Sequence, residues 1–185
     1  MIRLFVETYT DKDPLRNAEL RACLAENLAN PHIGSVHEIA FGRRATMGEA
    51  LDFMRQHMGA DDVGILANSD IAFDETLSLL QGRRFPDTVL CVSRWENGEP
   101  YAHSDSQDVW IFDGVPRSGV KAEFFFGIPG CDNRFAHELR EVGYSLLNPC
   151  LNLRCHHRHT SGVRNYDDAT PRLTGPIAHV HPCSL

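Results

Sequence analysis

The stretch from Val63 to Thr76, VGILANSDIAFDET, decides the fold. It opens as a short apolar run, Val63–Ala67, which is typical of a buried parallel strand, and stops abruptly at Asn68-Ser69-Asp70. Polar residues at the end of a buried strand cost solvation free energy unless something there uses them, and open α/β sheets bind ligands at the carboxyl ends of their strands. Asp70 is therefore the first candidate for handling a metal or a phosphate. The same residue types also form turns, so the tripeptide alone favours a turn equally.

The segments before Val63 predict an α/β fold with a parallel sheet. Thr46 and Glu49 have the spacing of a capping box, in which each side chain bonds the other's backbone amide, so we expect a helix to begin there. Apolar periodicity predicts the earlier elements, which are a strand at Ile2–Tyr9, a helix at Leu15–Ala29 and a strand at Ser35–Phe41. The order strand, helix, strand, helix, strand is that of a βαβαβ unit.

The segments after Asp70 complete one domain. We expect a short helix at Asp74–Gln81, strands at Thr88–Ser93 and Val109–Phe112, a helix at Asp132–Val142, and extended segments at Tyr144–Leu147 and Leu151–His159. The length of 185 residues fits a single domain with a substantial core. That domain is expected to span residues 1–166, with residues 167–185 as a C-terminal tail that wraps it.

Composition excludes some classes of partner. The formal net charge of −7 argues against nucleic acid, because phosphate backbones bind basic surfaces. The six cysteines are scattered without a C-x-x-C pair, which fits a reduced cytoplasmic setting better than a disulfide scaffold. No apolar run reaches membrane-spanning length, and the apolar run at the N-terminus is too short for a signal peptide. We therefore expect a cytoplasmic protein without a transmembrane segment.

Asp132 is the second carboxylate that can do chemistry. It stands at the expected start of a helix, in the sequence Gly130-Cys-Asp-Asn133, and is interpreted as the N-cap. Backbone amides that bond a capping carboxylate lower its pKa, which suits an electrostatic role or a weak base better than a proton donor. A role as general base is not excluded, because geometry decides first.

His157 and His159 are the candidates for nitrogen ligands. They are two residues apart, so on a strand both point to the same face and both can reach one metal. Asp70 with one of these histidines would suit Mn²⁺ or Mg²⁺. The bland alternative is an exposed histidine-rich strand. A zinc alternative lacks the regular spacing of a structural zinc site and draws on Cys155, His157, His159, His179, His181 and Cys183.

The order of short motifs along the chain resembles a known family. These motifs run from about Thr8 to Tyr166 and are NSDIxFD, SRW, SQDVWIF, GxPGCDNRxAxEL and HxHxSxxRNY. Together they resemble small glycosyltransferase-like proteins of the GT-A fold, related to family 2 glycosyltransferases. The resemblance implies a GT-A-like, Rossmann-like α/β domain with a mixed, mostly parallel sheet flanked by helices. It also implies metal-dependent, inverting transfer of a sugar from a UDP- or GDP-sugar to a hydroxyl acceptor.

The resemblance assigns the metal and the base. Asn68-Ser69-Asp70 takes the place of a D-x-D-type motif, in which Asp70 would carry Mn²⁺ or Mg²⁺ alone and Asn68 would hydrogen-bond the nucleotide, at its ribose. His157 or His159 would be a further metal ligand. Asp132 would deprotonate the acceptor hydroxyl. The chemistry is consistent, because a divalent ion stabilises the leaving diphosphate and a positioned carboxylate activates the incoming hydroxyl.

The resemblance also assigns the nucleotide side. Thr8 and Tyr9 would lie against the base, Arg44 of an R-x-T element would face the nucleotide, and Arg164 would supply positive charge near the phosphates. The segment from Asp105 to Asp108 would line the sugar or the acceptor. Asp108 and Ser69 would be among the residues that bind the nucleotide sugar.

Two other functions stay open at this point. The short chain leaves few residues to build an acceptor site. A partner domain, a homodimer or a macromolecular acceptor would complete that site. A catalytically weak domain that binds nucleotide sugars is the first alternative. The second is a metal-binding or interaction protein built on the His/Cys-rich C-terminal segment.

Overall fold

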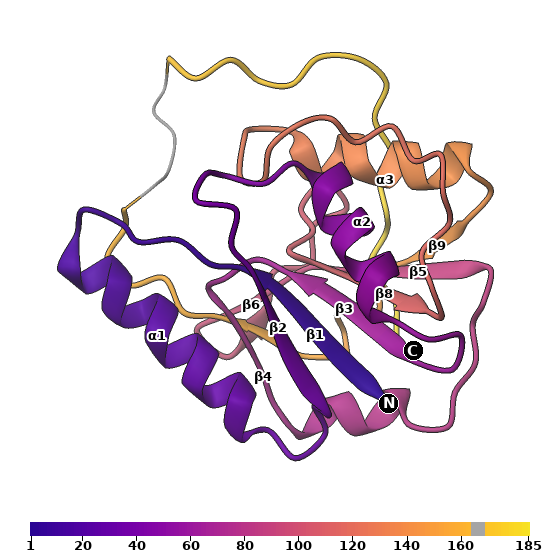
Figure 1. The fold of residues 1–185 in the computed structure, drawn as a ribbon, viewed down its shortest axis with the longest axis horizontal. Helices are drawn as coiled ribbons and strands as arrows, with labels where there is room; N and C mark the ends of the chain where they lie inside the picture. Colours follow the sequence, from indigo (N-terminus) through magenta and orange to yellow (C-terminus); the bar gives the residue numbers. More distant parts are fainter. Residues whose placement is uncertain (164–168) are drawn as a thin grey trace.

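The computed structural model describes residues 1–163 and 169–185, and within them a six-stranded mixed sheet forms the centre (Figure 1). Its strands, in spatial order, are β2 (Ser35–Ile39), β1 (Ile2–Glu7), β3 (Val63–Ala67), β8 (Val109–Asp113), β5 (Thr88–Val92) and β9 (Ser145–Leu147). β1 pairs in parallel with β2 and β3, and β5 pairs in parallel with β9. β8 runs antiparallel between β3 and β5. The predicted parallel βαβαβ unit is confirmed.

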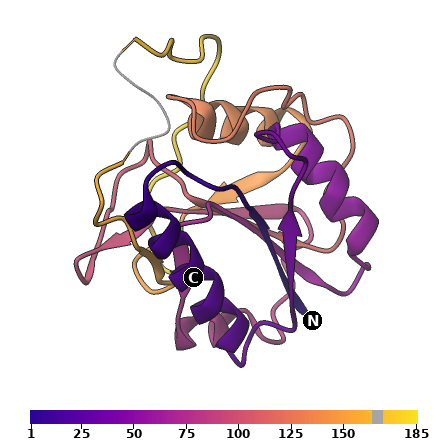
Figure 2. The same cartoon turned by 60° about the vertical axis from the view of Figure 1, so that its left-hand side comes forward.

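Helices cover both faces of this sheet. They are α1 (Pro14–Ala29), α2 (Met47–His57), α3 (Cys131–Glu141) and the 3₁₀ helix η1 (Glu75–Leu80). α2 and α3 lie on one face, and α1 lies on the other (Figures 1 and 2). Within β1, Phe5 packs into the core below α2 and α3, whereas Leu4 and Val6 pack into a second core on the opposite face. Both faces are therefore buried, which explains why β3 reads as a continuous apolar run.

Local sequence signals set several boundaries. Thr46 and Glu49 form the expected capping box at the start of α2, with Glu49 N donating to Thr46 Oγ1 over 3.1 Å. β1 ends at Glu7, so Thr8 and Tyr9 lie in the loop that follows the strand rather than inside it. The segment predicted as a short helix after Asp70 forms η1, a tighter 3₁₀ helix.

A second, small sheet brings the C-terminal part of the chain to Asp70. Its order is β4 (Ile71–Phe73), β10 (Cys155–His157), β6 (Trp95–Glu96) and β7 (Glu99–Pro100). β10 runs antiparallel to β4, with His157 directly opposite Ile71. Of the segment predicted to be extended, Leu151–His159, only β10 is a strand.

The last residues return to the core. Ala178 and Val180 are buried against the core that α3 covers, and Ala178 N donates to the backbone oxygen of Asn133 over 3.0 Å. Within residues 1–163 and 169–185, no helix has both the length and the apolar character that crossing a bilayer requires.

Candidate functional site

A cavity of about 680 Å³ opens at the carboxyl edge of the central sheet. Glu7 ends β1, Asp70 lies just beyond β3, Arg94 lies just beyond β5, and Asp108 precedes the antiparallel β8, so all four reach the same edge. Most of the predicted site residues line this cavity, namely Tyr9, Arg44, Asn68, Ser69, Asp70, Asp108, Asp132, His157 and His159. Ligands bind at such an edge in open α/β sheets.

One predicted residue, Thr8, lies elsewhere. Thr8 lines a second cavity of about 390 Å³ between β1 and α1, which shares Tyr9 and Ser69 with the larger one. Arg164 lies outside the described residues, so its predicted place near the phosphates stays a prediction.

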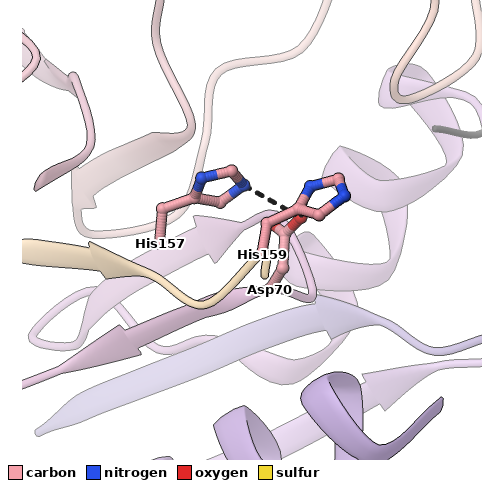
Figure 3. A group of neighbouring side chains, drawn as sticks. All are labelled: Asp70, His157 and His159. Carbon is pink, nitrogen blue, oxygen red and sulfur yellow. Dashed lines mark hydrogen bonds and ion pairs between the residues drawn. The ribbon is translucent and has the colours of Figure 1, made fainter. Parts of the chain in front are cut away.

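Asp70, His157 and His159 converge at the larger cavity (Figure 3). Asp70 Oδ2 lies 3.2 Å from Nε2 of His157 and 3.8 Å from Nδ1 of His159. The pairing of β4 with β10 causes this, since Asp70 immediately precedes β4, and the amide of Arg158 donates to the Asp70 backbone oxygen over 2.9 Å. The structure brings both histidines close to Asp70, although only His157 belongs to β10 and His159 lies beyond the end of the strand.

These three side chains can hold a divalent cation. One ligand atom from each lies within 4.8 Å of the other two. Two ligands at right angles, each about 2.1 Å from an ion, are about 3 Å apart, so the more distant of these atoms must move closer together to share one ion. His159 Nδ1 is the ring nitrogen that faces Asp70, while His159 Nε2 is buried without a hydrogen-bond partner among the described residues.

His157 is oriented by a contact that sequence reasoning missed. Its Nδ1 lies 3.1 Å from Glu96 Oε1, and the same oxygen accepts from Arg94 Nε over 2.5 Å. Burial alone would lower the pKa of His157, but the hydrogen bond and charge of Asp70 raise it above its ordinary value. Arg94 and Glu96 flank Trp95 in and beside the SRW motif, and that motif is the one signal for them in the sequence.

Asp70 has a second cationic partner, Arg16 of α1. Arg16 Nη2 lies 2.6 Å from Asp70 Oδ2, and Arg16 is 4% exposed. Burial opposes ionisation of Asp70, but His157 and Arg16 outweigh it and lower the pKa of the carboxyl well below its usual range. Nothing in the sequence near Arg16 distinguishes it from a solvated arginine in the first turn of a helix.

Asn68 contacts a carboxylate rather than the metal group. Its Nδ2 donates to Asp108 Oδ1 over 3.1 Å, while Arg94 Nη1 lies 3.4 Å from Asp108 Oδ2. Burial raises the pKa of Asp108, although Arg94 opposes this. The amide at the expected first-acid position therefore bonds a second acid, Asp108, that also lines the cavity.

The interpretation of Asp132 as an N-cap is wrong. Gly130 caps α3 with a φ of 86°, a left-handed conformation that glycine adopts readily, and Asp132 lies within the first helical turn. The expectation of a lowered pKa is also wrong, because burial and the charge of Asp108 raise the pKa of Asp132 to about 6. Hydrogen bonds from Cys131 Sγ, at 3.0 Å, and from nearby backbone do not offset these effects.

The predicted zinc alternative does not assemble in the part of the chain that the structure describes. There, the group of three potential metal ligands is Asp70, His157 and His159. Cys155 is fully buried, and burial raises the pKa of its thiol well above the ordinary value, which disfavours the thiolate that zinc requires.

Comparison with known proteins leaves the site to be interpreted from its own residues. No protein-family model matches the sequence. No curated protein matches it either. The chemistry of the cavity therefore carries the functional argument.

Proposed function

We propose that this chain is a GT-A-type glycosyltransferase that moves a sugar from a nucleoside diphosphate sugar to a hydroxyl acceptor with inversion. One observation carries the proposal. A single cavity at the carboxyl edge of the sheet is lined both by the group Asp70, His157 and His159 and by Asp132, a carboxylate with a raised pKa. Inverting glycosyl transfer needs these two parts, a cation for the leaving diphosphate and a base for the acceptor.

Asp70, His157 and His159 would hold the divalent cation. When bound, the ion stabilises the negative charge that develops on the departing diphosphate. One carboxylate and two imidazoles suit Mn²⁺ better than Mg²⁺, because Mg²⁺ prefers oxygen ligands. Glu96 holds the ring of His157 in place through Nδ1, which leaves Nε2 directed at Asp70.

Asp132 would take the proton of the acceptor hydroxyl. A pKa of about 6 leaves this carboxylate ionised at neutral pH, while making it a stronger base than an ordinary aspartate. Asp108 contributes to that basicity, since its negative charge raises the pKa of Asp132.

The nucleoside would occupy the smaller cavity between β1 and α1. Thr8, Tyr9 and Ser69 line it, and Tyr9 and Ser69 also line the larger cavity, so a ligand can extend from one to the other. A nucleoside diphosphate sugar has this extended form. Its uridine or guanosine would lie beside Thr8 and its diphosphate beside Asp70.

The first test is nucleotide binding. We expect Mn²⁺ together with UDP or GDP to raise the melting temperature more than either component alone. Because a site that binds both components links their affinities, the combined shift should exceed the sum of the two. A panel of nucleoside diphosphates that gives no shift with Mn²⁺ would overturn the proposal.

The second test is turnover. We expect slow release of diphosphate from a UDP- or GDP-sugar, and loss of this release in Asp70→Ala. Asp132→Asn should still bind the nucleotide but lose transfer to an acceptor. Asp52→Asn, which changes an exposed carboxylate of α2, is the matched control and should keep both activities.

A domain that binds nucleotide sugars without turnover is the second candidate. It is favoured by the contacts of the D-x-D-like segment, because Asn68 bonds Asp108 and Asp70 already has Arg16 as a counter-ion. The two candidates differ in one measurement. Binding of a nucleoside diphosphate with Mn²⁺, without release of diphosphate from any nucleotide sugar, would select the binding domain.

A further inference from the structure

Arg16 contacts the carboxylate oxygen of Asp70 that a bound cation would also contact. Its Nη2 lies 2.6 Å from Asp70 Oδ2, the same oxygen that faces His157 Nε2 at 3.2 Å and His159 Nδ1 at 3.8 Å. That oxygen is therefore the point at which the guanidinium and the candidate metal ligands meet. A divalent ion bound there would place two cationic groups against one carboxylate oxygen.

Arg16 also has unused hydrogen-bonding capacity at the cavity. Its side chain is 5% exposed and lines the larger cavity, and its Nε is buried without a hydrogen-bond partner among the residues that the structure describes. A buried donor without a partner costs free energy, so a ligand that satisfies it is favoured. The guanidinium presents several donors in a planar fork that matches the oxygens of a phosphate.

The guanidinium of Arg16 has a second carboxylate partner, Glu19. Arg16 Nη1 lies 3.1 Å from Glu19 Oε2, one turn further along α1. Glu19 in turn accepts from the amides of Thr160 and Ser161, at 2.6 Å and 2.5 Å, which ties α1 to the loop after His159. Arg16 can therefore leave Asp70 without leaving the cavity wall.

We propose that Arg16 is an exchangeable phosphate ligand, which neutralises Asp70 when no cation is bound and moves to a ligand phosphate when a divalent cation takes the Asp70 carboxylate. This inference rests on the proposed function for the identity of the ligand, a nucleoside diphosphate. Arg16 would then have opposite effects on the binding of the two ligands. Arg16 weakens the binding of the cation alone and strengthens the binding of the diphosphate once the cation is present.

The test compares Arg16→Gln with wild type in two titrations, Mn²⁺ alone and then UDP, GDP or inorganic pyrophosphate at saturating Mn²⁺. We expect Mn²⁺ alone to bind about threefold to tenfold tighter in Arg16→Gln, since a competing cation is gone. We expect the diphosphates to bind at least about tenfold weaker. A residue that only supports Asp70 would weaken both, and that result, or no change in either, would overturn the inference.

Two further variants keep the test interpretable. Arg172→Gln removes another arginine that lines the cavity and should leave Mn²⁺ affinity within about twofold of wild type, so it controls for a general loss of positive charge. Arg16→Lys keeps the charge but not the fork, and should bind Mn²⁺ as weakly as wild type. Equal tightening of Mn²⁺ in Arg172→Gln and Arg16→Gln would also contradict the exchange.

The inference and the proposed function can fail separately. If pyrophosphate shows the predicted pattern and no nucleoside diphosphate binds better than pyrophosphate, Arg16 exchanges as inferred and the nucleotide-sugar function is wrong. If UDP or GDP binds with Mn²⁺ and Arg16→Gln leaves both affinities unchanged, the function stands and the exchange is wrong. If wild type does not bind Mn²⁺, both are wrong.

Discussion

The Nδ1 atom of His157 lies 3.1 Å from Oε1 of Glu96, while Nε2 of the same ring faces Asp70. A carboxylate on the far nitrogen fixes the orientation of a metal-binding imidazole, and removing such a partner typically costs about tenfold to a hundredfold in metal affinity. We therefore expect Glu96→Gln to weaken Mn²⁺ binding by about tenfold. Titration calorimetry measures this. Glu99→Gln, an exposed glutamate of β7, is the control, and an equal loss in both variants would refute the role of Glu96.

Cation binding should depend on pH through His157. Its pKa is raised above 6.5 by Asp70, against the effect of burial, so the ring is substantially protonated below that pH. A metal binds only the neutral ring, and the affinity for Mn²⁺ should therefore fall as pH falls, by about fourfold or more between pH 8 and pH 6. Burial and Arg16 lower the pKa of His159, so this residue adds little over that range. Equal affinity at both pH values would contradict a cation bound to His157.

Asp132 should make stability fall as pH rises. Its pKa in the folded chain is about 6, against an ordinary value of 3.8, so between these values the folded chain holds the extra proton and stability declines with increasing pH. Two pKa units correspond to about 3 kcal/mol, and the partial exposure of the side chain reduces this to about 1–2 kcal/mol.

Asp132→Asn removes that dependence. We expect the variant to be more stable than wild type at pH 8 and much closer to wild type at pH 4, where the carboxyl of Asp132 is protonated in the folded chain. Urea unfolding at the two pH values measures the difference. Asp52→Asn on α2 serves as the control, and a stability gain of the same size at pH 4 would show that ionisation of Asp132 is not its cause.

Asn27 should be the main polar link between α1 and the strand that follows Asp70. Its Nδ2 donates to the backbone oxygen of Ile71 over 2.9 Å, and its Oδ1 accepts from the amide of Phe73 over 3.0 Å. Asn27→Ala leaves both buried backbone groups without partners, at a cost of about 2–3 kcal/mol in the free energy of unfolding.

The control for Asn27 is its neighbour Leu28, which is 65% exposed. Leu28→Ala should change the free energy of unfolding by less than about 0.5 kcal/mol. If Asn27→Ala is as mild as Leu28→Ala in chemical denaturation, β4 is held by other contacts.

Several parts of the fold follow from local sequence. The apolar run Val63–Ala67 and the capping box of Thr46 and Glu49 identify β3 and the start of α2 without tertiary information, because periodicity and end-capping act within a few residues. Polar residues at the end of a buried strand also point to the carboxyl edge as the site. The two-residue spacing of His157 and His159 predicts one shared face only for a strand, and β10 ends at His157, so this periodicity does not place His159.

Tertiary structure decided which side chains contact the candidate site residues. Arg16 reaches Asp70 from 54 positions away, and Glu96 reaches His157 from 61 positions away, so no local pattern could reveal either contact. The pKa of Asp132 depends on burial and on the charge of Asp108, which packing alone brings close, and a local expectation of amide bonds therefore gave the wrong direction.

The sequence by itself determined which strand ends in polar residues and which helix begins where. The tertiary structure alone decided which charged side chains contact one another at the cavity. The physical reason is the sequence distance over which each interaction acts. Hydrogen-bonded turns and caps are fixed by neighbours along the chain, whereas ion pairs and desolvation depend on groups that only the folded sheet brings together.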